Sequence, residues 1–111
     1  MLGLALDSKA DKEWDVLYNG SMGTVRTDGN LVSVRIKTGS TAISSTDWTT
    51  MGELSRVGDG IPSQYYPQSN VYSPYLNGIT VMINTNGEIK ANRPAGQVNG
   101  NVEINVVYPV W

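Results

Sequence analysis

The chain has 111 residues, 8 of them basic and 10 acidic, with a formal net charge of -2, which predicts one domain of ordinary size. The basic residues form no run that could follow a phosphate backbone, which argues against nucleic acid as a partner. Cysteine and histidine are absent, which excludes a disulfide framework and removes the commonest ligands of transition metals.

The first six residues alternate leucines with smaller residues, and this period-2 pattern is typical of a strand. So short a segment cannot bury its leucines alone. The leucine row therefore packs either on upstream sequence or on copies of itself around a symmetry axis. The polar segment that follows, over residues 7–14, fits one helical turn. We interpret residues 1–13 as the end of a neck or linker and residues 14–111 as a β head domain.

Short strand-like runs separated by turn residues follow the neck. Asp28-Gly29 and Asn86-Gly87 each stand between two such runs, and these dipeptides are strong hairpin signals because Gly accepts a positive φ. Asn19-Gly20 predicts another turn, and by alternation Val16 and Tyr18 share one face of the preceding strand. The expected strands are 15–19, 22–27, 30–37, 79–83, 88–91 and 102–108, with a further extended segment over 41–54.

The stretch over residues 55–74 is predicted to be irregular, because its glycines and prolines are incompatible with a central strand. Residues 92–101 form a second predicted loop. Long loops on a β scaffold often carry binding sites. No segment of the head shows a helical apolar period, and turn signals recur roughly every 8 to 12 residues. The sequence therefore predicts an all-β domain, built as an antiparallel sandwich or barrel.

Several segments occur in a recognisable order: EWDVLYNGS (13–21), DWTTMGEL (47–54), Tyr-Tyr-Pro (65–67), NTNGEIKAN (84–92) and VVYPVW (106–111). Over residues 14–111 this order resembles the receptor-binding protein heads of phages that infect Gram-positive bacteria, the lactococcal siphophages in particular. Two departures are the long segment ELSRVGDGIPSQYYP and the Trp that follows the terminal Tyr-Pro-Val. Both would alter the binding surface relative to that of the family.

The resemblance implies a homotrimer of jelly-roll-like or barrel heads on a narrower neck, with saccharide sites near the head tip or between protomers. A trimerising neck would bury the leucine row. The protein would then belong to the virion, at the distal tail or baseplate, and would attach the phage to saccharides of the host cell wall. Contacts with other baseplate or tail proteins would run through an N-terminal part that precedes this sequence.

Residues suited to saccharide binding gather in and around the first predicted loop. Such sites combine an aromatic face, which packs on sugar C–H groups, with polar side chains that hydrogen-bond the hydroxyls. The candidate residues are Asp47, Trp48, Arg56, Asp59, Gln64, Tyr65, Tyr66, Asn70 and Tyr72. The alternative for the tyrosines is packing against the sheet. For Trp48 the alternative, which the absence of Phe slightly favours, is a place as the main core residue.

Catalytic chemistry has little support in the sequence, so we expect a binding domain and not an enzyme. No serine lies in a Gly-x-Ser-x-Gly elbow, and no acidic spacing typical of a calcium loop is present, so neither a metal nor a cofactor is expected. No apolar run approaches the roughly 20 residues of a membrane span, so no membrane insertion is expected. Two alternatives stay open: a purely structural trimeric cap or assembly domain of a phage tail, and a polysaccharide depolymerase that uses Asp47, Glu53 and Asp59.

Overall fold

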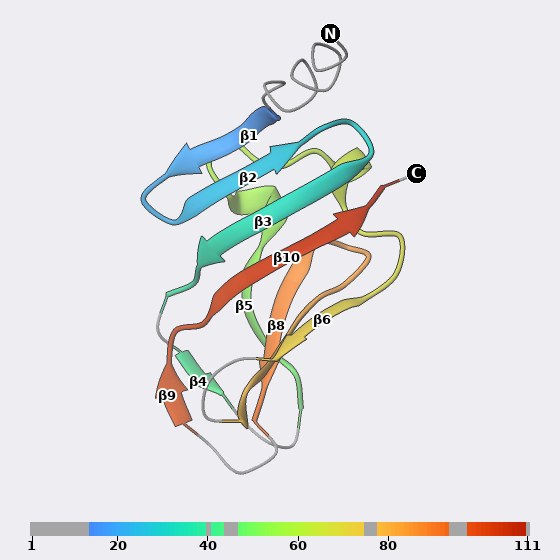
Figure 1. The fold of residues 1–111 in the computed structure, drawn as a ribbon. Helices are drawn as coiled ribbons and strands as arrows, with labels where there is room; N and C mark the ends of the chain where they lie inside the picture. The colour runs from blue at the N-terminus through green and yellow to red at the C-terminus, as the bar shows by residue number, and fades with distance from the viewer. Residues whose placement is uncertain (1–13, 40, 44–46, 75–77, 94–97, 111) are drawn as a thin grey trace, which may run out of the picture.

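The computed structural model describes residues 14–39, 41–43, 47–74, 78–93 and 98–110, which Figure 1 draws in colour. The predicted neck at residues 1–13 and Trp111 lie outside the described residues, so the boundary at residue 14 stays a prediction. The described residues form strands and two short 3-10 turns, which confirms the predicted all-β class. None of their helical turns is long and apolar enough to cross a membrane.

The strands pair antiparallel in three sheets, with the orders β1-β2-β3-β10, β5-β8-β7-β6 and β4-β9. Two single-turn 3-10 helices, η1 (Leu54–Arg56) and η2 (Ser63–Tyr65), lie between β5 and β6. The strand bounds are β1 (Asp15–Gly20), β2 (Gly23–Thr27), β3 (Leu31–Lys37), β4 (Thr41–Ile43), β5 (Thr49–Glu53), β6 (Val71–Pro74), β7 (Thr80–Ile83), β8 (Glu88–Asn92), β9 (Val98–Gly100) and β10 (Glu103–Pro109).

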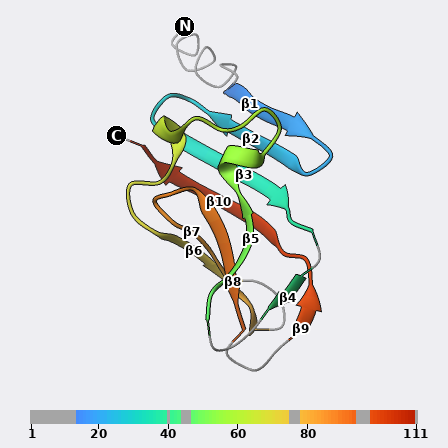
Figure 2. The ribbon, with the colours of Figure 1, turned by 180° about the vertical axis from the view of Figure 1, so that it is seen from behind.

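The two four-stranded sheets lie face to face, and the β4–β9 ribbon extends from one end (Figures 1 and 2). In the second sheet β6, β7 and β8 follow one another as neighbours while β5 lies beside β8, which is a Greek-key order. The first sheet is completed by β10, which pairs with β3 along its whole length. The result is a two-layer antiparallel arrangement.

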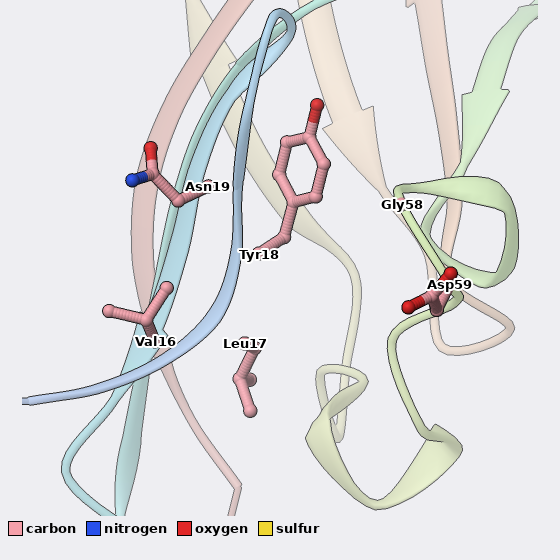
Figure 3. Close-up of a pocket in the computed structure, with 6 residues that line it drawn as sticks. All are labelled: Val16, Leu17, Tyr18, Asn19, Gly58 and Asp59. Carbon is pink, nitrogen blue, oxygen red and sulfur yellow. The ribbon is translucent and has the colours of Figure 1, made fainter.

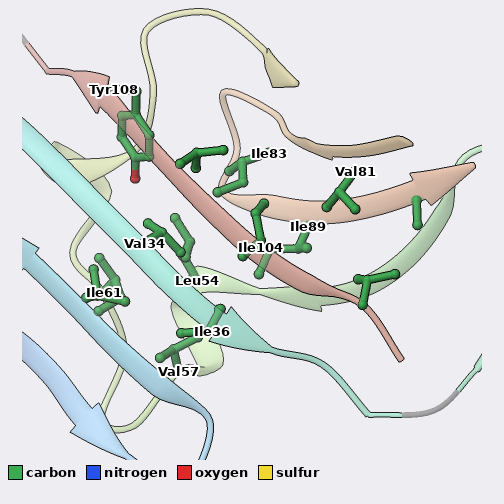
Figure 4. Close-up of a cluster of buried hydrophobic side chains, with 14 of the residues drawn as sticks. Val34, Ile36, Leu54, Val57, Ile61, Val81, Ile83, Ile89, Ile104 and Tyr108 are labelled. Atoms are coloured by element: carbon green, nitrogen blue, oxygen red, sulfur yellow. The ribbon is translucent and has the colours of Figure 1, made fainter. Parts of the chain in front are cut away.

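Alternation along the strands sends one face of each large sheet into a common core (Figure 4). Val34 and Ile36 of β3 and Ile104 of β10 are buried, whereas their neighbours along each strand are exposed or half-buried. Val81 and Ile89 reach the same core cluster from the second sheet. Each such side chain contributes about 1.5–3 kcal/mol to folding by leaving water.

The segment after β5 also contributes to the core, although it forms no strand. Leu54, Val57 and Ile61 are almost fully buried and belong to the same cluster. Backbone hydrogen bonds hold the segment in place, with the Leu54 N–H donating to Gly87 O over 2.8 Å and the Ile61 N–H donating to Leu54 O over 2.9 Å. This part of the predicted irregular stretch is therefore a packed and hydrogen-bonded loop.

The hairpins predicted at Asp28-Gly29 and Asn86-Gly87 are present. In the first, the Asp28 carboxylate accepts 2.8 Å hydrogen bonds from the backbone N–H groups two and three residues later. In the second, Asn84 Oδ1 accepts from the N–H groups two and four residues later. The φ of Gly87 is +79°, in the left-handed region that favours glycine. Local turn chemistry therefore accounts for both hairpins.

The turn between β1 and β2 lies two residues beyond the predicted Asn19-Gly20. Gly20 belongs to β1 and pairs with Gly23, so Ser21 and Met22 make the reversal. The prediction was wrong in position because the Asn-Gly pair ends a strand here instead of forming the turn.

A β-bulge at Leu17 changes the phase of β1. Val16 pairs with Arg26, and Tyr18 pairs with Val25, the residue adjacent to Arg26 in β2. Leu17 is therefore the extra residue of the bulge. Tyr18 therefore packs against the core, whereas Val16 is 54% exposed on the other face. The predicted shared face of Val16 and Tyr18 is wrong for this reason.

Two short strands form within segments that were predicted as loops. One is β6 at the end of the 55–74 stretch, and the other is β9 within 92–101. Because β6 is an edge strand that ends at Pro74, it tolerates a residue without an N–H. The extended segment predicted over 41–54 is divided between β4 and β5, which belong to different sheets.

Candidate functional site

The register of the second sheet places one residue of each strand in a row across its outer face. Tyr72 lies opposite Met82, Met82 opposite Lys90, and Lys90 opposite Thr50. Both neighbours of Met82 along β7 belong to the core cluster. Since side chains alternate between the two faces of a strand, this row faces away from the core.

Trp48 and Tyr72 meet over this row. Their ring centroids lie 6.2 Å apart with an interplanar angle of 49°. Trp48 precedes β5 and Tyr72 belongs to β6, and these strands are the opposite edges of the sheet, so the two side chains approach each other across the middle strands. Trp48 is 37% exposed and Tyr72 57% exposed. The core position that the sequence slightly favoured for Trp48 is therefore wrong.

Met82 lies in the middle of this row and is buried although it is on the outer face. It points to the outer face and is not a member of the core cluster, yet it is only 6% exposed. A side chain in the middle of the row is expected to be covered where two rings from the sheet edges meet above it. The burial of Met82 fits a position beneath the two rings.

Polar groups border the two rings. Asn70 Nδ2 lies 3.5 Å from the Tyr72 hydroxyl, and Asn92 Nδ2 donates to the Asp47 carbonyl oxygen over 3.1 Å, just before Trp48. Lys90 is half-buried, with Nζ 4.0 Å from a Glu88 carboxylate oxygen. We refer to Trp48 and Tyr72 together with their neighbours as the aromatic surface, whose remaining members are Thr50, Asn70, Met82, Lys90 and Asn92.

The structure brings four of the predicted site residues together, namely Asp47, Trp48, Asn70 and Tyr72. Sequence reasoning missed Lys90 and the other members contributed by β7 and β8. Alternation within the predicted strands 79–83 and 88–91 could have placed them on the face opposite the core residues. The pairing of β5 with β8, which brings Trp48 to that face, has no local signal in the sequence.

Arg56 and Asp59 lie elsewhere, on the loop after β5 that faces β1. Arg56 Nε lies 3.0 Å from Glu53 Oε2, an exposed ion pair between residues three apart. Asp59 lines a pocket of about 470 Å³ between this loop and residues 16–19 of β1, which Figure 3 shows from close by. These two predicted residues therefore do not share the aromatic surface.

Gln64, Tyr65 and Tyr66 occupy η2 and the residue that follows it. Gln64 is exposed, whereas Tyr65 and Tyr66 are half-buried and pack against the core. The Tyr66 ring lies against Gly87, where a Cβ would come within 2.8 Å of it. The Tyr65 carbonyl oxygen accepts a 2.7 Å hydrogen bond from the Tyr108 hydroxyl. Packing against the sheet, the alternative for Tyr66 and Tyr72, therefore holds for Tyr66 and not for the exposed Tyr72, and Tyr65 packs in the same way as Tyr66.

The described residues show few features suited to metal binding or to acid–base chemistry. No group of three or more acidic residues there is placed to hold a metal ion. Burial, with a smaller contribution from Tyr66, raises the pKa of Tyr108 well above the value of an exposed tyrosine. That hydroxyl is engaged with the Tyr65 carbonyl, so it acts as a structural donor.

Comparison with protein-family models, curated proteins and solved structures gave no significant match. The functional argument therefore depends on the geometry of the sites themselves.

Proposed function

We propose that this chain is the saccharide-binding head of a phage receptor-binding protein, acting as a homotrimer at the distal end of the tail. The observation that carries the proposal is the contact between Trp48 and Tyr72 on the outer face of the second sheet, with both rings open to solvent. Contiguous exposed apolar surface bordered by polar groups is typical of interaction sites.

The chemistry of the aromatic surface suits a sugar. The two tilted rings offer faces on which the C–H groups of a pyranose pack. The amides of Asn70 and Asn92 and the ammonium group of Lys90 are placed around the rings and hydrogen-bond hydroxyl groups readily. Tryptophan and tyrosine have few rotatable bonds, so binding immobilises little of the protein.

Binding at one such surface is expected to be weak, in the millimolar range, or about -4 kcal/mol. Three copies in a trimer, and several trimers on one baseplate, would convert weak sites into firm attachment through effective concentration. The proposal includes trimerisation through the neck at residues 1–13 and a jelly-roll-like head. The Greek-key order of the second sheet supports the latter, because jelly rolls are built from Greek keys.

The test is binding of the full chain to purified cell-wall polysaccharide from Gram-positive bacteria, after its mass has been measured by light scattering. Trp48→Ala and Tyr72→Ala are expected to weaken binding at least tenfold, or about 1.4 kcal/mol. Tyr72→Phe keeps the ring and should retain most of the affinity. Val107→Ala is the matched control, because Val107 is 54% exposed on the outer face of the other sheet.

Four outcomes would contradict the proposal. A folded monomer in dilute solution would refute the trimer, and unchanged binding by both alanine variants would refute the site. A stable trimer that binds no polysaccharide would favour the purely structural cap. Shortening of the polymer during incubation would instead indicate a depolymerase.

A further inference from the structure

The pocket between β1 and the loop after β5 is separate from the aromatic surface. It is lined by six residues: Val16, Leu17, Tyr18, Asn19, Gly58 and Asp59. It is a cleft open to solvent, with a volume of about 470 Å³. Figure 3 shows Tyr18 and Asp59 directed into the space between the two segments, with Val16 and Asn19 on the other side of β1. The pocket is therefore formed by the Tyr18 ring, the Leu17 side chain, the Asp59 carboxylate and backbone.

The Tyr18 ring is a fixed wall of this pocket. A Cβ on Gly58 would lie 2.5 Å from Tyr18 Cδ1, so the ring packs directly against the glycine backbone. At the other end of the side chain, the hydroxyl accepts a hydrogen bond from the Met22 N–H over 3.1 Å. The bulge at Leu17 is what turns Tyr18 toward this side of β1.

Asp59 lies on the loop after β5, across the pocket from β1. Val57, immediately before the Gly58–Asp59 corner, is buried in the core, and the Gly60 N–H donates to its carbonyl oxygen over 2.9 Å. Asp59 itself is exposed and forms no ion pair or hydrogen bond with any residue that the structure describes. The nearby Arg56 is paired with Glu53. The carboxylate therefore keeps its full capacity to accept hydrogen bonds.

We propose that this pocket is a second saccharide site, which holds one neutral sugar ring against Tyr18 while Asp59 accepts hydrogen bonds from two adjacent hydroxyls. A peptide strand is the competing occupant, because β1 is an edge strand. The bulge at Leu17 interrupts the regular spacing of N–H and C=O groups that strand addition requires. The unpaired negative charge of Asp59 disfavours acidic sugars and phosphates.

This inference deepens the proposed function and rests on it, since it gives each head two sites of different selectivity. The aromatic surface includes the cationic Lys90, whereas the pocket includes the anionic Asp59. A polymer with a neutral sugar unit could thus occupy both sites on one head, and double occupancy would raise the affinity through effective concentration.

The test is a titration of the ¹⁵N-labelled full chain with methyl α-glucoside, methyl α-galactoside, N-acetylglucosamine and glucuronate, each to about 100 mM, well above a millimolar Kd. The backbone amides of Tyr18, Gly58 and Asp59 report on the pocket, and the indole N–H of Trp48 reports on the aromatic surface. At least one neutral sugar is expected to shift the pocket amides, and glucuronate is not.

Two variants of Asp59 test the role of its carboxylate in binding and in selectivity. Asp59→Ala should weaken binding at the pocket at least tenfold without changing the response of the Trp48 indole. Asp59→Asn keeps the shape, removes the charge and should reduce the preference for neutral sugars over glucuronate. Pocket amides that respond to no neutral sugar while the Trp48 indole does would overturn this inference and leave the proposed function standing. A response of the pocket alone would overturn the aromatic surface as the primary site.

Discussion

Replacing Gly58 with alanine tests whether Tyr18 is held against the loop as described. The φ of Gly58 is +60°, and a residue with a Cβ loses about 1–2 kcal/mol in that left-handed conformation. The new Cβ would also lie 2.5 Å from Tyr18 Cδ1, so the ring must turn away. A rotation of about 30° off a rotamer costs about 0.5–1.5 kcal/mol. We therefore expect Gly58→Ala to lower the free energy of unfolding by about 1.5–3.5 kcal/mol.

The matched control is Gly78→Ala. The φ of Gly78 is +74°, and a Cβ there would meet no atom of the described residues within 4 Å, so only the backbone cost of about 1–2 kcal/mol is expected. Urea denaturation followed by tryptophan fluorescence measures both variants. In a Tyr18→Ala background, the extra cost of Gly58→Ala over Gly78→Ala should disappear. Equal costs of the two glycine substitutions in the wild-type background would refute the packing of Tyr18 on Gly58.

Three further predictions concern the scaffold and use the same unfolding measurement. Tyr108→Phe leaves the Tyr65 carbonyl without its donor and should cost about 1–2 kcal/mol. Because burial raises the pKa of Tyr108 above the ordinary 10.0, the unfolded chain loses this proton first as the pH rises. Stability should then fall by about 1.4 kcal/mol per pH unit above pH ~10, until the folded hydroxyl ionises, and Tyr108→Phe should remove this contribution. Asn84→Ala removes the acceptor of two turn N–H groups and should cost about 1–2 kcal/mol, whereas the exposed Asn86→Ala should cost under about 0.5 kcal/mol.

The parts of the fold that were predictable from sequence are those set by local chemistry. Alternation alone placed the strands near 31–37 and 103–109, whose inward residues are buried in the structure. The Asp28-Gly29 and Asn86-Gly87 pairs marked real hairpins because glycine and an acceptor side chain satisfy the turn within a few residues.

The wrong predictions concern structural features that depend on residues distant in the sequence. The bulge at Leu17 has no sequence signature of its own, yet it reverses the face on which Tyr18 lies. It lets two consecutive side chains, Leu17 and Tyr18, pack on the core side next to the loop that carries Gly58. Simple alternation cannot anticipate this, since the bulge serves a contact with residues some forty positions away.

The candidate site residues also include some that the sequence identified and some that only the strand pairing could separate from the rest. Composition was enough to single out Trp48, Asn70 and Tyr72, because aromatic and amide side chains were concentrated in that part of the chain. It could not separate them from Tyr65 and Tyr66, which have the same chemistry and are half-buried in packing. Only the pairing of β5 with β8 and of β6 with β7 distinguishes the two groups.

The outer faces of the two large sheets differ in how their exposed apolar side chains are arranged. On the first sheet the exposed Val16 and Val107 occupy the opposite ends of one row, with Arg26 and Ser33 between them. Each is thus an isolated apolar side chain, which needs no explanation on a protein surface. On the second sheet the row runs from Tyr72 to Thr50, and the ring of Tyr72 lies near that of Trp48, which directly precedes β5 at the opposite edge. Both sheets present their outer faces to water, so among the described residues the paired rings are the one feature that distinguishes the second sheet, and the proposed saccharide site rests on this difference.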